Sequence, residues 1–169
     1  MPEAGLIAKV EAAFPGKIKE SHSSHGDETV VIDRDDALAI FGALKDDPQF
    51  AFDFLMDLTA VDFLGQEPRF EIVYHLYSLR LNYRLRVKIR VSEDDPSVPS
   101  VSSLWKSANW LEREVWDLLG ITFSDHPDLR RILMYEEFRG HPLRKDYPVA
   151  KRQPLVQERD PVTNPWPKR

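Results

Sequence analysis

Two adjacent apolar runs, separated by only a few residues, constrain the fold of this chain more than any other feature. Phe70–Ser78 is apolar on both faces, which is typical of a strand inside a sheet. Leu81–Val91 alternates between apolar and polar side chains, the pattern of a strand with one buried face. The short link around Leu79-Arg80 predicts that the two strands form a β-hairpin.

Helical spacing predicts that helices pack against this sheet. Residues Glu3–Phe14 fit one helix, and a second is expected after Asp33 or Asp35, either of which could cap it. The longest helix is expected over Val101–Leu119, with Ser100 or Ser102 as N-cap and Gly120 as the left-handed residue that ends it. Its expected core face consists of Leu104, Ala108, Leu111, Val115 and Leu118, and a second stripe, a candidate interface, consists of Trp105, Glu112, Trp116 and Leu119.

The remaining patterns complete a prediction of fold class. Short strands are expected at Lys17–Ser21 and Thr29–Ile32 around a polar loop, whereas Phe50–Asp62 fits neither a helix nor a strand cleanly. We therefore predict an α+β fold: a single domain with a mixed, largely antiparallel sheet packed by helices. Residues 139–169 hold six prolines and few apolar side chains, so we expect the domain at 1–139 and an extended, proline-rich, partner-docking C-terminal tail at 140–169.

Composition excludes several functions. The 169 residues contain no cysteine, which removes disulfides, thiol nucleophiles and cysteine ligation of iron–sulfur clusters. Without a spanning apolar run or a basic N-terminal region, we expect a soluble, unexported chain. The net charge of −5 divides into −9 over residues 1–68 and +4 over residues 69–169. Such a chain lacks the strongly basic domain that general nucleic-acid binding requires.

Charged residues of alternating sign are concentrated between Glu112 and Pro148, among glycines and prolines that fix the backbone path. Exposed ion pairs contribute only about 0–1 kcal/mol, so stability gives little reason to gather them here, and we interpret the region as a docking surface. A solvated loop with local salt bridges is the alternative. The candidate docking residues are Glu112, Arg113, Glu114, Trp116, Asp117, His126, Asp128, Arg130, Arg131, His141, Arg144, Lys145, Asp146 and Tyr147.

Other side chains suggest chemistry only weakly. Arg84, Arg86, Lys88 and Arg90 form a row on one strand, which fits a solvent-facing surface better than a phosphate grip. His22 and His25, near Asp27 and Glu28, fit a solvated loop better than a metal site. Known phosphate-loop, nucleophile-elbow and metalloprotease motifs are absent, and Glu112 and Glu114 would point to different sides of their helix. An enzyme using Glu112, His126 or His141 remains a rival hypothesis.

Several separated blocks resemble one known family, the 30 kDa subunit of respiratory complex I, also called the C subunit of bacterial NADH-quinone oxidoreductase. The signature runs from Glu112-Arg113-Glu114 through Asp117 and His126 to Arg130 and Ile132. Further blocks lie at residues 57–62, 74–78 and 140–148. The resemblance covers roughly residues 30 to 148, and the segment after Val149 is shorter than many tails of that family.

The resemblance implies a non-catalytic core subunit of the peripheral arm, on the cytoplasmic side of the bacterial inner membrane. It implies docking to the D subunit (the forty-nine-kilodalton protein of complex I) and to adjacent iron–sulfur subunits, near the quinone-reducing end. It also implies no flavin, cluster or metal on this chain, with FMN and iron–sulfur clusters on other subunits. The chain would be connected to NADH, quinone and the membrane only through the complex. Related chains serve hydrogenase, formate hydrogenlyase and other-donor complexes, which is the alternative assignment.

Overall fold

A computed structural model describes residues 5–150 and 152–153 of the chain. Its elements follow one another as α1 (Leu6–Ala13), β1 (Ile18–Ser24), β2 (Asp27–Ile32), a 3-10 turn (Arg34–Asp36), α2 (Ala37–Asp46), β3 (Phe54–Asp62), β4 (Phe70–Ser78), β5 (Tyr83–Val91), β6 (Ser97–Pro99), α3 (Ala108–Leu119) and β7 (Thr122–Ser124). The first two residues of the helix predicted from Glu3, and the tail prolines from residue 154 on, lie outside the described residues.

Five strands form one mixed sheet in the order β1-β2-β5-β4-β3. Three of its four pairings are antiparallel and the β2–β5 pairing is parallel. The predicted hairpin is confirmed, since β4 pairs with β5 in a register that runs from Phe70↔Val91 to Ser78↔Tyr83. A short parallel pair, β6–β7, stands apart from this sheet. The structure confirms the α+β fold with a mixed, largely antiparallel sheet.

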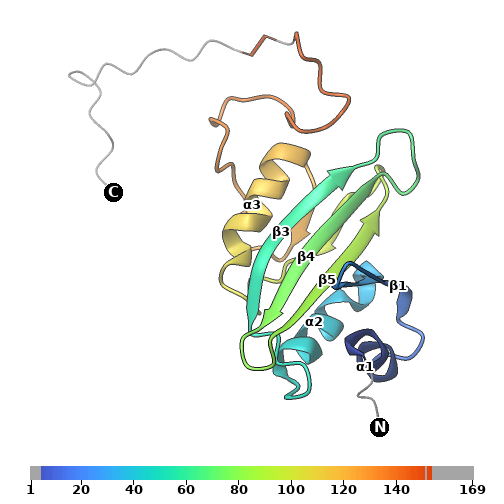
Figure 1. Cartoon of the computed structure of the whole chain (residues 1–169). Coiled ribbons are helices and arrows are strands. Elements are labelled where there is room, and N and C mark those ends of the chain that lie inside the picture. Colours follow the sequence, from blue (N-terminus) through green and yellow to red (C-terminus); the bar gives the residue numbers. More distant parts are fainter. Residues whose placement is uncertain (1–4, 151, 154–169) are drawn as a thin grey trace, which may run out of the picture.

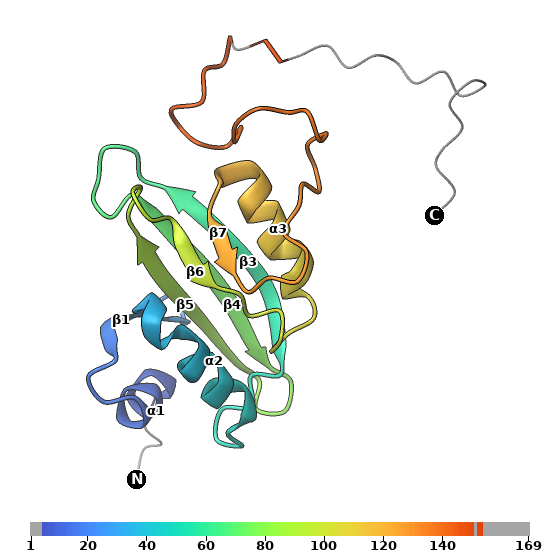
Figure 2. The same ribbon diagram turned by 180° about the vertical axis from the view of Figure 1, so that it is seen from behind.

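The helices lie together on one side of the sheet. Figures 1 and 2 show α2, α3 and the β6–β7 pair on the same face, with the opposite face left uncovered by them. Between these layers lies one continuous core that draws on every strand from β2 to β7 and on all three helices. Burying one face of each element in this way supplies most of the driving force for folding.

Two predicted strands near the N-terminus are longer than expected. β1 and β2 form a hairpin whose two-residue turn is His25-Gly26, with φ of 55° and 87°. Positive φ at both positions suits the right-handed twist of the paired strands, so the expected polar loop is largely strand.

In β3, a bulge between Leu55 and Asp57 places Leu55 and Leu58 on the buried side although they are three residues apart. The bulge explains why this sequence fits no simple period.

The start of the long helix is also different from the prediction. α3 begins at Ala108 rather than near Val101, and its first turn has no side-chain cap. Ser100 and Ser102, expected as caps, instead hydrogen-bond to each other at 2.8 Å inside the protein. Neither Asp33 nor Asp35 caps α2: the helix follows a 3-10 turn, and Asp33 pairs with Lys19 at 2.7 Å.

Tyr74 offers a test of this core. Its side chain is fully buried, and its hydroxyl has no hydrogen-bond partner among the described residues. An unsatisfied buried hydroxyl costs about 1–3 kcal/mol, so we expect Tyr74→Phe to leave the free energy of unfolding unchanged or to raise it. Urea unfolding of the two proteins measures the difference. Tyr74→Ala is the contrast and should lose about 3–5 kcal/mol of stability. A clear loss of stability for Tyr74→Phe would mean that the hydroxyl has a partner.

Candidate functional site

The Asp117 carboxylate is the centre of the signature region. It lies on the last turns of α3 with no exposed surface. Its Oδ2 accepts hydrogen bonds from the backbone amides of Ile132, Leu133 and Met134 at 2.9–3.0 Å, and its Oδ1 accepts from Arg131 Nη1 at 2.5 Å. Burial alone would raise the pKa of Asp117, but these donors together lower it below its usual value. The residue is therefore a charged anchor for the chain that follows β7.

Two arginines extend this attachment. Arg113 donates from Nε and Nη2 to the backbone carbonyls of Arg130 and Arg131, at 3.1 and 2.9 Å. Arg131 donates onward to the carbonyls of Phe138 and Gly140, at 2.7 and 3.2 Å. Its guanidinium also lies 5.8 Å from the centre of the Trp116 ring. Guanidinium groups suit this role because several fixed donors project from one plane.

Residues 141–144 cap the C-terminal end of α3. The last carbonyls of a helix have no partner within it, and cations are favoured there. The carbonyls of Asp117, Leu118 and Leu119 accept from His141 Nδ1 (3.0 Å), the Leu143 amide (3.0 Å) and Arg144 Nε (2.6 Å). Burial lowers the pKa of His141 more than its bond to the Asp117 carbonyl raises it.

Gly120 makes this close approach possible. Its φ is +75°, the left-handed conformation predicted for the end of the helix. A Cβ at this position would lie 2.6 Å from His141 Cδ2 and 2.9 Å from Arg144 Nη2. Any larger residue would therefore suffer both backbone strain and a clash with the capping side chains. A glycine is required here by packing as well as by backbone geometry.

The buried side chain of Arg69 attaches residues 145 and 146 to the sheet. Arg69 has 2% of its surface exposed and makes a bidentate pair with Asp62, at 2.8 and 2.9 Å. It also pairs with Glu93 at 2.5 Å and with Asp146 at 3.0 Å. The Arg69 hydrogen bonds hold the pKa of both Asp62 and Asp146 below the usual range. Asp62 further accepts from the Lys145 amide at 2.8 Å, so residues 145 and 146 close over this charge cluster.

Glu112 anchors the turns that precede α3. It is fully buried, and its two oxygens accept from Ser100 Oγ at 2.6 Å and the Val101 amide at 2.7 Å. Burial raises the pKa of Glu112 to about 7, more than these two hydrogen bonds lower it. His126 lies nearby, but its Nε2 bonds to the Asn109 carbonyl at 3.0 Å and its Nδ1 accepts from the Asp128 amide. Both imidazole nitrogens are thus engaged within the chain.

The structure corrects the expectation that the signature side chains lie on the surface. Glu112, Asp117 and Trp105 are buried, so the predicted interface stripe of Trp105, Glu112, Trp116 and Leu119 faces the protein interior. A charged residue was expected outside because burial is costly, but internal donors offset that cost for Asp117 and offset part of it for Glu112. Four of the candidate docking residues have exposed side chains that take no part in these attachments: Glu114, Asp128, Arg130 and Lys145.

The packed part of the chain continues past the predicted boundary at residue 139. His141, Arg144 and Asp146 all contact the domain, and the Tyr147 ring stacks on Phe138 with centroids 6.0 Å apart. Neither Arg69 and Glu93 nor the bond of Ser100 to Glu112 was predicted from the sequence. The one signal available for Arg69 was its place beside a strand that is apolar on both faces.

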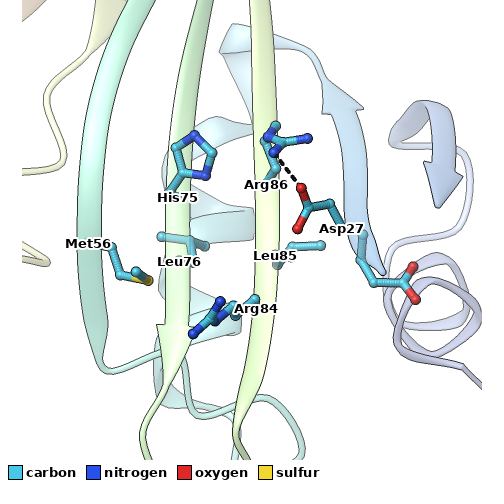
Figure 3. Close-up of a pocket in the computed structure, with 8 residues that line it drawn as sticks. Asp27, Met56, His75, Leu76, Arg84, Leu85 and Arg86 are labelled. Atoms are coloured by element: carbon cyan, nitrogen blue, oxygen red, sulfur yellow. Dashed lines mark hydrogen bonds and ion pairs between the residues drawn. The ribbon is translucent and has the colours of Figure 1, made fainter. Parts of the chain in front are cut away.

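The row of strand cations lies on the uncovered face of the sheet, as expected. Figure 3 shows a hollow there in which Arg86 reaches Asp27, with Nη2 and Oδ2 3.1 Å apart. Lys88 and Arg90 both pair with Glu71, and Arg84 lies over the Tyr77 ring. Because these cations already have partners within the chain, they have little capacity to bind a phosphate.

The described residues lack two features that other functions would need. They contain no group of three or more acidic or histidine side chains that could hold a metal ion, around His22 and His25 or elsewhere. None of the helices in this part of the chain combines the length and apolarity needed to cross a membrane. The fold and the network define an α+β domain whose signature side chains tie residues 126–147, here called the C-terminal segment, to α3 and the sheet.

Comparison with known proteins identifies the family. The family described as "Respiratory-chain NADH dehydrogenase, 30 Kd subunit" matches residues 30–153. The chain is 46% identical over 145 residues to the C subunit of NADH-quinone oxidoreductase of Roseiflexus castenholzii, covering 86% of this chain and 83% of that protein. It is 48% identical over 144 residues to the corresponding subunit of Geobacter sulfurreducens, covering 85% and 88%. This chain belongs to the family of 30 Kd subunits of respiratory-chain NADH dehydrogenase.

One solved structure agrees with this assignment, and a second shares the fold. The trypsin-resistant fragment of Nqo5 superposes with a TM-score of 0.64 at 35% sequence identity, covering 73% of this chain and 96% of the fragment. A chain of the membrane-bound sulfane sulfur reductase, an archaeal respiratory membrane complex, superposes with a TM-score of 0.70 at 22% identity, covering 85% and 84%. The second likeness concerns the fold alone.

Asp117→Asn tests the anchoring role of this carboxylate. The asparagine side chain would keep the shape of aspartate but would lack the negative charge that pairs with Arg131. Its NH2 group would also face backbone N–H groups, which cannot accept a hydrogen bond. Breaking a buried pair from one side costs about 3–5 kcal/mol, and we expect a loss of that size in urea unfolding. Glu114→Gln, on an exposed position of the same helix, is the matched control and should change stability by less than about 0.5 kcal/mol. Equal effects of the two substitutions would contradict the anchoring role.

The raised pKa of Glu112 predicts a pH dependence. Because its folded pKa of about 7 lies above its ordinary value of 4.5, the stabilising contribution is complete below pH 4.5 and is lost as the pH rises through 7. The loss is on the order of 3 kcal/mol, since each pKa unit corresponds to about 1.4 kcal/mol. Glu112→Gln should remove this dependence, so the stability difference between the two proteins should change as the pH is raised from 4.5 to above 7. Parallel stability curves over that range would mean that Glu112 does not titrate there.

Proposed function

We propose that this chain is a non-catalytic core subunit of the peripheral arm of a proton-translocating NADH:quinone oxidoreductase. It assembles with other subunits of that complex and docks to the D subunit and adjacent iron–sulfur subunits. In that position it holds the quinone-reducing module in register. The complex, not this chain, reacts with NADH and quinone, and the chain meets the cytoplasmic side of the bacterial inner membrane only through the complex.

The observation that carries this proposal is the family match over residues 30–153, which includes the whole signature region. The relatives reported above are bacterial NADH-quinone oxidoreductase subunits, and the alignments span most of both chains. Electron transfer and quinone access depend on how neighbouring subunits are placed. A rigid domain can therefore be essential to the complex without taking part in electron transfer.

The residues of this chain also support a role without catalysis. Glu112, His126 and His141, the residues of the enzyme hypothesis, are each held by hydrogen bonds within the chain. The sequence has no cysteine, the residue that supplies iron–sulfur ligands. We therefore assign FMN and iron–sulfur clusters to other subunits of the complex, and no cofactor or metal to this chain.

The exposed part of the signature is the part available to a partner. The Arg130 and Lys145 side chains project from the C-terminal segment and hold no element of the fold in place. The Arg130 guanidinium pairs with Asp128, at 2.9 Å, in an exposed salt bridge. Such a pair contributes about 0–1 kcal/mol to stability, which leaves the guanidinium available for a carboxylate on a neighbouring subunit.

We expect the double variant Arg130→Ala, Lys145→Ala to assemble poorly while folding normally. The measurement is affinity purification of the tagged chain from native membranes in mild detergent, with mass spectrometry of the recovered subunits. The unmodified chain should bring down the D subunit and the flavin-bearing subunits, and the variant several-fold less of both. Lys19→Ala, on the exposed salt bridge with Asp33, is the control and should recover as much as the unmodified chain.

Each other outcome has a distinct meaning. Recovery of a D-subunit homologue with hydrogenase or formate dehydrogenase subunits would keep the scaffold role and change the electron donor. A chain recovered without other subunits would contradict the proposed function. Equal loss of thermal stability and of recovery in the double variant would show that these residues act on the fold rather than on docking.

A further inference from the structure

An apolar groove lies between the start of β3 and the start of α3. It is lined by Phe54, Met56, Lys106, Ser107, Trp110 and Leu111. Trp110 is 69% exposed, and Phe54 and Met56 are each 46% exposed. Scattered apolar residues on a surface are ordinary, but three large ones around one groove are the mark of a binding surface.

The groove is rigid because hydrogen bonds join its two walls. Ser107 Oγ donates to the Leu55 carbonyl at 3.2 Å, and the buried Trp105 Nε1 donates to the Phe52 carbonyl at 3.0 Å. Both bonds connect the turn before α3 with the chain at the start of β3. A preformed surface loses little conformational entropy when a partner binds, which favours affinity.

One charge at this groove has no partner among the described residues. Among the described residues, the Lys106 side chain has neither an acceptor nor an aromatic ring against it. Other exposed cations of the domain are paired, as Lys17 with Asp36 is at 2.6 Å. An unpaired ammonium beside an apolar groove is complementary to a carboxylate that follows or precedes a large apolar side chain.

We propose that this groove binds a segment of a partner subunit that carries a large apolar side chain next to an aspartate or glutamate. The apolar side chain lies between Trp110 and Met56, and the carboxylate pairs with Lys106. Tryptophan dominates binding energy at many interfaces, and charge at the rim directs association. The inference rests on the proposed function, since it assigns a second contact surface to the same assembled subunit, distinct from Arg130 and Lys145.

The experiment uses the assembled complex. Met56→p-benzoylphenylalanine places a photo-cross-linker in the groove, and irradiation is followed by affinity purification and peptide mass spectrometry. We expect a cross-link to one peptide of another subunit that has an aspartate or glutamate near a large apolar residue. Lys106→Glu should lower recovery of that subunit, and lysine in place of the partner's carboxylate should restore it.

Two further variants separate binding from folding. Trp110→Ala should lower recovery of the cross-linked subunit by about tenfold, the typical scale of an interface tryptophan. Leu79→Ala, on a side chain that is 65% exposed at the tip of the β4–β5 hairpin, is the matched control and should leave recovery unchanged. Both variants should melt within a few degrees of the unmodified domain, because neither side chain belongs to the core.

The outcomes distinguish this inference from the proposed function. If partner subunits are recovered but the cross-link falls on a second copy of this chain, on lipid, or on nothing, the groove proposal is wrong and the scaffold role stands. Unchanged recovery with both Trp110→Ala and Lys106→Glu would have the same meaning. If the unmodified chain recovers no other subunit, the proposed function fails and this inference fails with it.

Discussion

The Asp117 carboxylate is cut off from solvent and needs donors from within the protein to remain charged. Three consecutive amides, of Ile132, Leu133 and Met134, and the guanidinium of Arg131 meet this need. If the chain after β7 moved away from α3, the buried Asp117 carboxylate would therefore lose its hydrogen-bond donors. The same attachment brings His141 and Arg144 to the end of α3 and Asp146 to Arg69.

This arrangement explains why charged residues are concentrated in a region where exposed ion pairs alone would add little stability. Exposed ion pairs contribute little, but a buried carboxylate with four donors fixes one backbone path and excludes others. In this family member, much of the signature organises the fold of the C-terminal segment. The surface that we propose for neighbouring subunits consists of its exposed charges and of side chains outside the signature, such as Trp110.

Periodicity was enough to predict the β4–β5 hairpin, the end of α3 at Gly120 and the fold class, because these depend on local pattern. It could not predict that Glu112 and Asp117 are buried, since the donors that make burial possible come from Ser100 and residues 131–134. The bulge in β3 and the cluster around Arg69 likewise depend on contacts between distant residues. The motifs drew attention to the region from Glu112 to Tyr147, and only the fold revealed that Glu112 and Asp117 within it are buried.

We infer that the Asp117 carboxylate holds residues 132–134 as firmly as the core holds its strands. Native-state hydrogen exchange of the backbone amides of Ile132, Leu133 and Met134 measures this directly. We expect these three amides, although they belong to no helix or strand, to exchange at protection levels approaching those of β4 amides such as Ile72. Exchange as fast as that of exposed loop amides would contradict it, because the carboxylate would then not be holding the segment.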